Sequence, residues 1–324
     1  MERPIDSTDF AAVKEMLRGP AALQMPTFNS DLSLNTDFLK ENIQFVHQGG
    51  LRRGRGFLIC PSGTGEFQSL TYQEHVAMVE AAVEATEGDL PVMAGMATPR
   101  LDIAIELAGK LQQAGAAAIM VPPPFYYKLD EDAFFSFYKE LASAVPIGIM
   151  IYDQVWRNLG TGVSLSMMER LATLPNMIAL KYGSPAHFTD MILAYQQFSD
   201  RFAFIDNSLA YTVAVSHMHG CQGYISFPVG LWPAFELKRW DLLEAGQYKE
   251  AELLGARFAK FLHRYLTGDE FGGAFVFHDG ATTKAMLEYA GLHGGPVRAP
   301  FRALTDREKS DMFAMLDEID KDVD

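Results

Sequence analysis

The chain has 324 residues, of which 48% are hydrophobic and 21% charged, a composition that is typical of globular enzymes and excludes wholesale disorder or a fibrous repeat. It carries 27 Lys and Arg against 41 Asp and Glu, a formal net charge of -14 at pH 7. An acidic chain lacks the broad basic surface that nucleic acids and anionic membranes attract, so we expect neither as a partner. The length allows two domains, although a barrel of this size often forms one.

Residues 1–18 (MERPIDSTDFAAVKEMLR) predict a short amphipathic helix rather than a signal peptide. No apolar run approaches the roughly 20 residues that cross a bilayer, so we expect a cytoplasmic protein. Cys60 and Cys221 are the two cysteines, and they lie far apart in apolar stretches. This spacing predicts two buried thiols in a reducing compartment and no disulfide framework.

Eight short apolar runs follow one another along the chain and are candidate strands. They are residues 22–28 (ALQMPTF), 56–60 (GFLIC), 91–96 (PVMAGM), 117–121 (AAIMV), 147–152 (IGIMIY), 177–181 (MIALK), 202–206 (FAFID) and 223–227 (GYISF). Because the runs are continuous rather than alternating, they predict strands that are buried on both faces.

The segments between the runs have helical periodicity, for example residues 71–85, 104–114 and 165–174. Ser164 and Ser166 are candidate caps of the third segment, and Glu169 stands where a capping box would place it. The runs recur on average every roughly 29 residues, close to one βα unit. Eight such units predict an α/β fold of the (β/α)8 TIM-barrel type. An open doubly wound sheet is the alternative, disfavoured because no GxGxxG follows the first run.

After the eighth run the pattern becomes helical. Four helical stretches cover residues 232–245, 248–266, 282–290 and 305–319, and a glycine-rich loop covers residues 268–280. No linker separates these stretches from the barrel. We therefore expect an N-terminal helical segment over residues 1–20, a barrel over 21–232, and C-terminal helices packed on the barrel over 233–324.

Lys181 closes the sixth run directly after four apolar residues. Since the functional groups of such a barrel lie at the C-terminal ends of its strands, Lys181 is expected to point into the barrel mouth, partly desolvated. Desolvation disfavours the ammonium form, and a neutral amine can attack a carbonyl carbon to form an imine. The alternative is a lysine whose stem packs at the rim while its head reaches water.

Tyr152 closes the fifth run, and its phenol could pass a proton during imine formation and bond cleavage. The loop after the second run, residues 61–67 (PSGTGEF), has small residues that let backbone N–H groups approach an anion, and Thr64 adds a hydroxyl. Such a loop suits a substrate carboxylate. Taken alone, Tyr152 could be a tyrosine at the rim of the barrel with its hydroxyl in water, and the loop could be an ordinary glycine turn. Their combination with Lys181 favours a catalytic site.

Two other groups of polar residues have simpler interpretations. Residues 206–208 (DNS) end the seventh run, where they could contact a polar substrate tail or cap a helix. His217 and His219 are two residues apart, so on a helix they point to different faces and do not predict a shared metal. A metal-dependent barrel aldolase is disfavoured because no His, Asp and Glu set falls on the strand ends.

Residues 63–67 (GTGEF), followed by SLT at 69–71 and by Glu74, resemble the GTTGE…LT..E signature of the dihydrodipicolinate synthase / N-acetylneuraminate lyase family. Six further matches occur in the same order as in that family. They are residues 25–28 (MPTF) with the first strand, 123–127 (PPFYY) with the PYY segment, Tyr152 with the YN pair, Lys181 with the imine-forming lysine, 223–226 (GYIS) with GxIS, and 295–300 (GPVRAP) with the close of the C-terminal helices. The matches extend over residues 20–320, and the chain is identified as a member of the family.

The resemblance implies a (β/α)8 barrel with C-terminal helices, usually a homotetramer. It implies class I Schiff-base chemistry on 2-oxo acids such as pyruvate, with no metal and no organic cofactor. By this resemblance Lys181 would form the imine with the 2-oxo carbon, and Tyr152 would pass protons. Thr64 would hydrogen-bond the phenol and, with the backbone of Gly63, hold the carboxylate.

Three more roles are implied by the same resemblance. Tyr126 matches the second tyrosine of PYY, which in parts of the family completes a proton relay across a subunit contact. Arg157 lies five residues after Tyr152, where synthase-like members carry a substrate-binding arginine. The backbone of Ile225 would line the pyruvyl pocket.

The sequence also departs from the family pattern. Gly63 stands where the family has the first threonine of its pair, and residues 153–155 (DQV) replace the NxP of YNxP. The GTGEF.SL run resembles the GGTGEFFSL of 5-dehydro-4-deoxyglucarate dehydratases more than the synthases. The acidic positions of sialic acid lyases fall on Ala210 and Tyr211, which disfavours sialic acid. Three hypotheses follow: a Schiff-base aldolase or dehydratase, a dihydrodipicolinate synthase-type condensing enzyme, and a non-catalytic binder of 2-oxo acids on the same barrel.

Overall fold

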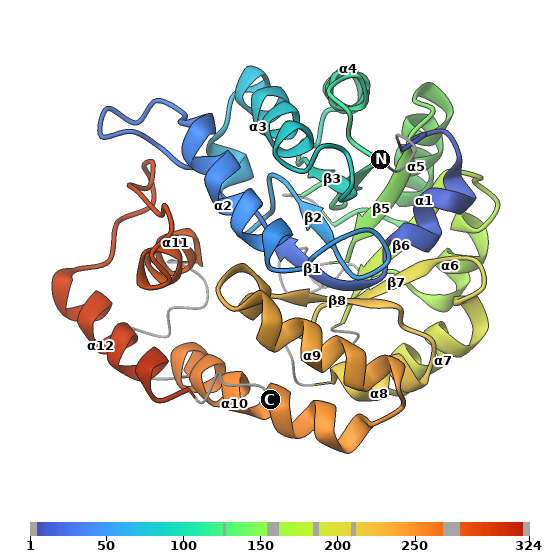
Figure 1. Ribbon diagram of the computed structural model, residues 1–324. Helices are drawn as coiled ribbons and strands as arrows, with labels where there is room; N and C mark the ends of the chain where they lie inside the picture. Colours follow the sequence, from blue (N-terminus) through green and yellow to red (C-terminus); the bar gives the residue numbers. More distant parts are fainter. Residues whose placement is uncertain are drawn as a thin grey trace.

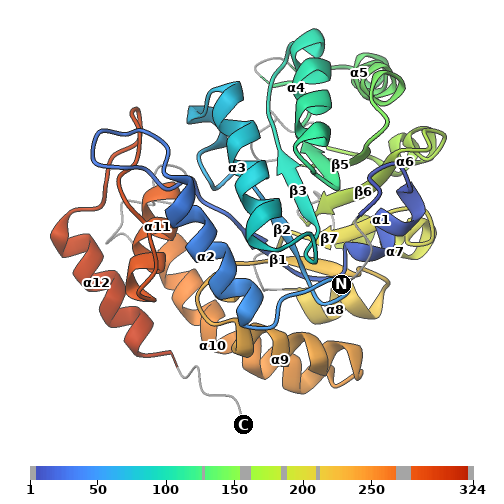
Figure 2. The ribbon, with the colours of Figure 1, turned by 45° about the horizontal axis from the view of Figure 1, so that its top comes forward.

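Continuous apolar runs form the strands of this protein, as expected for strands that are covered on both faces. The computed structural model describes residues 5–125, 128–153, 162–183, 188–208, 212–267 and 279–319. Eight parallel strands close into a barrel in chain order, with β1 beside β8 (Figures 1 and 2). They are β1 (Gly19–Leu23), β2 (Phe57–Ile59), β3 (Val92–Gly95), β4 (Ala118–Val121), β5 (Gly148–Tyr152), β6 (Met177–Tyr182), β7 (Ala203–Asp206) and β8 (Gly223–Ser226). The predicted (β/α)8 TIM barrel is confirmed.

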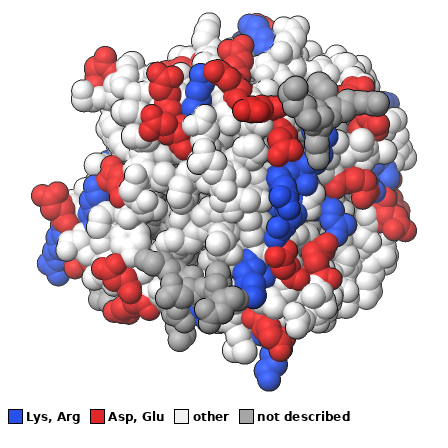
Figure 3. Space-filling view, in the orientation of Figure 1, with Lys and Arg blue, Asp and Glu red and all other residues white. Residues whose placement is uncertain are grey.

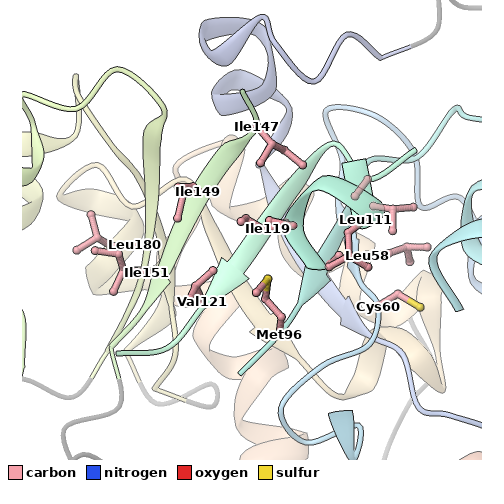
Figure 4. Close-up of a cluster of buried hydrophobic side chains, with 14 of the residues drawn as sticks. Leu58, Cys60, Met96, Leu111, Ile119, Val121, Ile147, Ile149, Ile151 and Leu180 are labelled. Carbon is pink, nitrogen blue, oxygen red and sulfur yellow. The ribbon is translucent and has the colours of Figure 1, made fainter. Parts of the chain in front are cut away.

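Helices cover the outside of the barrel. They are α2 (Thr36–Gln48), α3 (Tyr72–Ala85), α4 (Leu101–Gln113), α5 (Glu131–Ala144), α6 (Leu165–Leu171), α7 (Phe188–Phe198) and α8 (Val213–Met218), with a short 3-10 turn η1 at Phe67–Ser69. An outer apolar cluster fills the space between strands and helices; it includes Ile149, Ile151 and Leu180, which Figure 4 shows among their neighbours. A second cluster fills the barrel interior, where Tyr152 and Ile225 lie.

The first helix, α1 (Phe10–Met16), closes the barrel at the N-terminal ends of the strands. Val13 and Leu17 are fully buried in the interior cluster of the barrel. The Gln222 side chain, just before β8, donates hydrogen bonds to the carbonyls of Lys14 and Leu17 at 2.8 and 3.1 Å. This N-terminal segment therefore fills the end of the barrel that lies opposite to the C-terminal ends of the strands.

In the described part of the chain, four helices follow the barrel: α9 (Pro233–Glu244), α10 (Tyr248–Thr267), α11 (Asp279–Tyr289) and α12 (Asp306–Asp317), after a second 3-10 turn η2 (Pro228–Gly230). They lie together along one side of the molecule, next to α2 (Figures 1 and 2). Met25, just after β1, shares an apolar cluster with residues of α10, α11 and α12. The division of the chain at residues 20 and 232 stays a prediction.

Three local expectations were wrong. The first strand covers Gly19–Leu23 instead of residues 22–28, because Met25 and Phe28 turn away to pack under the C-terminal helices. Ser164 alone caps α6, accepting a hydrogen bond from the Met167 N–H, so Glu169 closes no capping box there. Gly280 lies in α11 rather than in a loop, while residues 268–278 lie outside the described residues.

The charged side chains are spread over the surface. On the face in Figure 3, Lys and Arg side chains alternate with Asp and Glu around an uncharged central area. Cys60 and Cys221 are buried and unpaired, as predicted. No helix in the described parts of the chain has both the length and the hydropathy needed to cross a membrane.

Candidate functional site

The ends of β5 and β6 bring the two main candidate residues together. Tyr152 and Lys181 are direct neighbours in the ladder between these strands. Both side chains point into the barrel: Tyr152 belongs to the interior cluster, and Leu180 and Tyr182, on either side of Lys181, belong to the outer one. The Lys181 ammonium nitrogen lies 3.7 Å from the centroid of the Tyr152 ring. The predicted placement of Lys181 at the inner mouth of the barrel therefore agrees with the structure.

A bulge between β5 and β6 produces this pairing. Ile149 faces Met177, but the next residue, Met150, faces Ala179, so Ile178 is an extra residue in β6. Ile178 and Ala179 both belong to the interior cluster, after which the alternation resumes with Lys181 inside. An extra residue in a strand moves all following side chains to the opposite face of the sheet, and such bulges often occur next to functional sites. Without Ile178 inserted, Lys181 would face the helices.

Gly148 makes room for this bulge. A Cβ atom added to Gly148 would lie 2.5 Å from Cδ1 of Ile178, closer than such atoms approach. A glycine at the start of β5 therefore lets the extra residue of β6 fit inside the barrel. Sequence reasoning missed both residues, because the run MIALK shows no break that marks a bulge.

Both key side chains are withdrawn from solvent. Lys181 is 3% exposed and Tyr152 is 7% exposed. A cation against the face of an aromatic ring is attracted by the ring's negative face. The Lys181 carbonyl also accepts a hydrogen bond of 3.1 Å from the Asp153 N–H. Lys181 is therefore fixed both through its side chain, by the Tyr152 ring, and through its backbone, by the Asp153 N–H.

The loop between β2 and η1 lies against the same tyrosine. A Cβ atom added to Gly63 would be 3.4 Å from ring carbons of both Tyr152 and Phe67. Gly63 therefore faces both rings at a distance that leaves room for a Cβ atom in ordinary van der Waals contact. Thr64 follows as a half-buried residue, and the Gly65 N–H donates a hydrogen bond of 2.9 Å to Ser62 Oγ.

Gly65 brings the loop close to the first strand. A Cβ atom there would lie 2.4 Å from the carbonyl oxygen of Gln24, a backbone atom that cannot move aside. A glycine is required for such an approach of two backbones. The loop is consequently packed between the end of β1 and the ring of Tyr152.

Gly183 plays a comparable part after β6. Its Cβ would lie 2.6 Å from the backbone nitrogen of Asn207, and the Asn207 N–H donates a hydrogen bond of 3.2 Å to the Tyr182 carbonyl.

Ile225 is buried in β8 beside Ala21 of β1, and its side chain belongs to the interior cluster. Tyr126 and Arg157 lie outside the described residues.

Asp153 is a buried carboxylate that the sequence did not single out for burial. It is 2% exposed, accepts a hydrogen bond from the Val163 N–H, and lies near the phenols of Tyr138 and Tyr182. Among the described residues its Oδ1 has no hydrogen-bond partner. Burial raises the pKa of Asp153 to about 7.

Asp206 has a structural role at the end of β7. Its carboxylate accepts hydrogen bonds from the Ser208 N–H at 2.6 Å, the Thr212 hydroxyl at 3.0 Å and the Ser216 hydroxyl. The helix α8 itself has no side-chain cap, so neither the capping nor the substrate-contact interpretation of residues 206–208 is confirmed. His217 pairs with Glu244 and His219 with Gln196, so the two imidazoles have separate partners. Within the described residues, no group of three or more His, Cys, Asp or Glu side chains could hold a metal ion.

Comparison with known proteins identifies what this arrangement resembles. Residues 17–319 match the model of the dihydrodipicolinate synthetase family. The 4-hydroxy-tetrahydrodipicolinate synthase of Chlorobium chlorochromatii is 31% identical over 248 residues, which cover 76% of this chain and 81% of that protein.

Solved structures show the same fold. A dihydrodipicolinate synthase from Aquifex aeolicus superposes with a TM-score of 0.80 at 20% identity, covering 93% of this chain and 98% of that one. A sialic acid aldolase from Ruminococcus gnavus, a catalytic lysine mutant, superposes with a TM-score of 0.81 at 19% identity, covering 95% and 98%.

Proposed function

Because this chain belongs to the dihydrodipicolinate synthetase family, it is a Schiff-base lyase that acts on a 2-oxo acid, and we propose that Lys181 is the lysine that forms the imine. The observation that carries this assignment is the position of Lys181. It lies near the C-terminal end of β6, buried inside the barrel, with its ammonium nitrogen 3.7 Å from the centre of the Tyr152 ring. Barrel enzymes place their reacting groups at this end.

The reaction begins when the neutral amine of Lys181 attacks the 2-oxo carbon. The carbonyl oxygen takes up a proton, and the resulting carbinolamine loses this oxygen as water to leave an iminium ion. Tyr152 is the group proposed to pass these protons, since its phenol lies beside the amine. The iminium then accepts electrons, either from the C3–C4 bond as an aldehyde leaves, or from the C3–H bond before a C4 hydroxyl departs.

The loop at Gly63 and Thr64 is proposed to hold the substrate carboxylate. Its position facing the Tyr152 ring supports this role, because a carboxylate bound there would place the adjacent 2-oxo carbon near Lys181. Backbone N–H groups and a hydroxyl that are fixed in advance stabilise an anion without reorganisation. The Ile225 backbone would line the other side of the pocket.

The finer assignments complete the proposal. The GTGEF.SL run favours aldol cleavage or dehydration of a 2-oxo sugar acid, while the relatives named 4-hydroxy-tetrahydrodipicolinate synthase favour condensation as the second candidate. Tyr126 is proposed to extend the proton relay and Arg157 to bind the distal part of the substrate. A homo-oligomer, tetramer or dimer, in the cytoplasm is proposed from the family pattern.

Borohydride trapping with pyruvate tests the imine. The wild-type protein should gain one reduced pyruvyl group, found by intact mass and mapped to Lys181, whereas Lys181→Ala should gain none and lose turnover. Lys110→Ala, which removes an exposed lysine of α4, should behave as the wild type. A wild-type rate in Lys181→Ala would refute the assignment. If the folded wild type binds both pyruvate and a longer 2-oxo acid but forms no adduct with either, the hypothesis of a non-catalytic binder would be favoured.

A further inference from the structure

A buried ion pair connects the loop between β2 and η1, which contains Gly63 and Thr64, to the C-terminal helices. Glu66, the residue after Gly65, is 1% exposed, and Lys284 of α11 is also 1% exposed. The Lys284 Nζ lies 3.0 Å from the Glu66 Oε1. The two residues are far apart in the chain, so the pair forms only when α11 docks on the barrel.

Other contacts enclose this pair on several sides. Lys284 Nζ also donates a hydrogen bond of 2.6 Å to the carbonyl of Pro296 and lies 4.3 Å from the centre of the Phe28 ring. The Arg298 N–H lies 3.5 Å from the second carboxylate oxygen of Glu66. A Cβ atom at Gly280 would come within 2.8 Å of Glu66 Oε1, so the first turn of α11 lies directly against this carboxylate.

The backbone of Glu66 shows that the loop is held in a defined shape. Its φ of 51° lies in the left-handed region that side chains other than glycine disfavour. Its carbonyl accepts hydrogen bonds from the N–H and the hydroxyl of Ser69 at 2.8 and 3.0 Å. A strained conformation of this kind persists only where surrounding contacts determine it.

The loop therefore has two distinct ends. At one end, Gly63 faces the ring of Tyr152, which a Cβ atom on Gly63 would meet at 3.4 Å; at the other end, Glu66 pairs with Lys284. The two positions are three residues apart, and Gly65 between them is pressed against Gln24. Because the segment between them is short and closely packed, a displacement of Glu66 would also move the amides of Gly63 and Thr64.

A buried ion pair contributes little net stability, because removal of both charges from water offsets their attraction. Its more specific effect is to define position, since the pair and the contacts around it with Pro296, Phe28 and Arg298 fix where the Glu66 carboxylate lies. We propose that Glu66 and Lys284 are positioning residues that hold the Gly63–Thr64 amides where the substrate carboxylate binds, and that α11 thereby belongs to the substrate-binding machinery. This inference rests on the proposed function of the loop.

Three variants separate positioning from stability. Glu66→Gln and Lys284→Met each leave one buried charge without its partner, so both should lower Tm clearly. The double variant Glu66→Gln/Lys284→Met leaves neither charge and should recover most of the lost Tm. The KM for the 2-oxo acid should nevertheless rise about tenfold or more in all three, with a smaller change in kcat, because the carboxylate loses well-placed donors.

The matched control is Glu308→Gln, which removes a more exposed ion pair with Arg302 in the same helical layer, away from the loop. It should leave KM unchanged. A double variant with recovered Tm and wild-type KM would overturn the proposal, because the pair would then be structural only. Glu66→Asp keeps the charge while it shortens the side chain, so it decides the matter if the double variant does not fold: a raised KM supports positioning, and a wild-type KM refutes it.

Hydrogen exchange tests the same inference without any substrate. Peptides that cover residues 61–70 should exchange about tenfold faster in the double variant, or in Glu66→Asp, than in the wild type, and Glu308→Gln should match the wild type. Unchanged exchange would overturn the proposal. Failure of the wild type to form an imine would instead refute the proposed function, so the two failures are distinguishable.

Discussion

The ring of Tyr152 lies over the ammonium of Lys181, so this residue offers two separable groups to the site. The aromatic face stabilises a cation, and the hydroxyl can carry a proton. Both residues could be found from the sequence, because each stands near the end of an apolar run and the ends of such runs meet at one rim. The contacts of Glu66 could not be found in this way, since they depend on a helix that follows the barrel.

Tyr152→Phe separates the two groups. The phenylalanine ring keeps the contact with Lys181, whereas the proton carrier is lost, so kcat/KM should fall by about 10²–10⁴. Reduced pyruvyl adduct should still form on Lys181, but more slowly. Steady-state kinetics and timed borohydride trapping measure the two effects. A variant with undiminished kcat/KM would show that the phenol carries no essential proton.

Asp153 should make folding stability depend on pH. Its pKa is raised by burial to about 7 from an ordinary value of 3.8, so between these values the folded protein keeps a proton that the unfolded chain releases. The free energy of unfolding therefore falls as the pH rises from about 4 to 7, by on the order of 2–4 kcal/mol, and is constant above.

Asp153→Asn removes this titration. We expect the variant to be more stable than the wild type at pH 8, with the difference disappearing toward pH 4, measured by urea denaturation across this range. Asp132→Asn, on the exposed side of α5, controls for the loss of one negative charge. A stability difference that does not change with pH would contradict the expectation.

At the scale of elements, the sequence predicted the order of strands and helices but not the register between β5 and β6. Buried runs with regular spacing predict the barrel, because each run needs cover on both faces. The first strand was misplaced because Met25 and Phe28 continue the apolar run while they pack against the C-terminal helices. The bulge at Ile178 leaves no mark in the run, since it depends on the space opposite, at Gly148.

Gly148→Ala should disturb the end of β6. The new methyl group would meet Ile178 Cδ1 at 2.5 Å, and overpacking of this kind costs about 1–3 kcal/mol. Turnover should fall with stability, because displacement of the bulge shifts Lys181. Thermal unfolding and kcat measure both effects. Addition of Ile178→Val, which removes Cδ1, should restore part of the activity.

Gly109→Ala is the matched control for this substitution. Gly109 lies inside α4, and its Cβ would meet nothing within 4 Å, so alanine should stabilise the helix by about 0.5–1 kcal/mol and leave kcat unchanged. Full activity in Gly148→Ala would show that the bulge tolerates the added methyl group.

At the scale of the whole molecule, the barrel and the C-terminal helices are joined by charged contacts around Phe28. Arg298 forms an ion pair with Glu74 at the start of α3, donates hydrogen bonds to the carbonyls of Leu32 and Ser69, and lies 4.1 Å from the centre of the Phe28 ring. The Arg298 guanidinium lowers the pKa of Glu74 to about 2. These links connect segments that are distant in the chain.

Glu74→Gln should weaken this connection in a pH-dependent way. The pKa of Glu74 is depressed in the folded state, so its contribution is present above the ordinary value near 4.5 and is lost as the pH falls toward 2. We expect a loss of about 1 kcal/mol at pH 7, since solvent screens a partly exposed pair, and a smaller loss at pH 3. Chemical denaturation at both pH values measures it; an equal loss at both would contradict the role of the charge.

The helix α1 determines how molecules can pass through this enzyme. Val13 and Leu17 fill the end of the barrel that lies at the N-terminal ends of the strands, so we expect substrates to approach Lys181 from the C-terminal ends. A 2-oxo acid bound to Lys181 would then lie between the lysine and the next molecule to arrive. In a condensation we therefore expect the 2-oxo acid to bind before its partner, and in a cleavage we expect the aldehyde to leave before the 2-oxo acid.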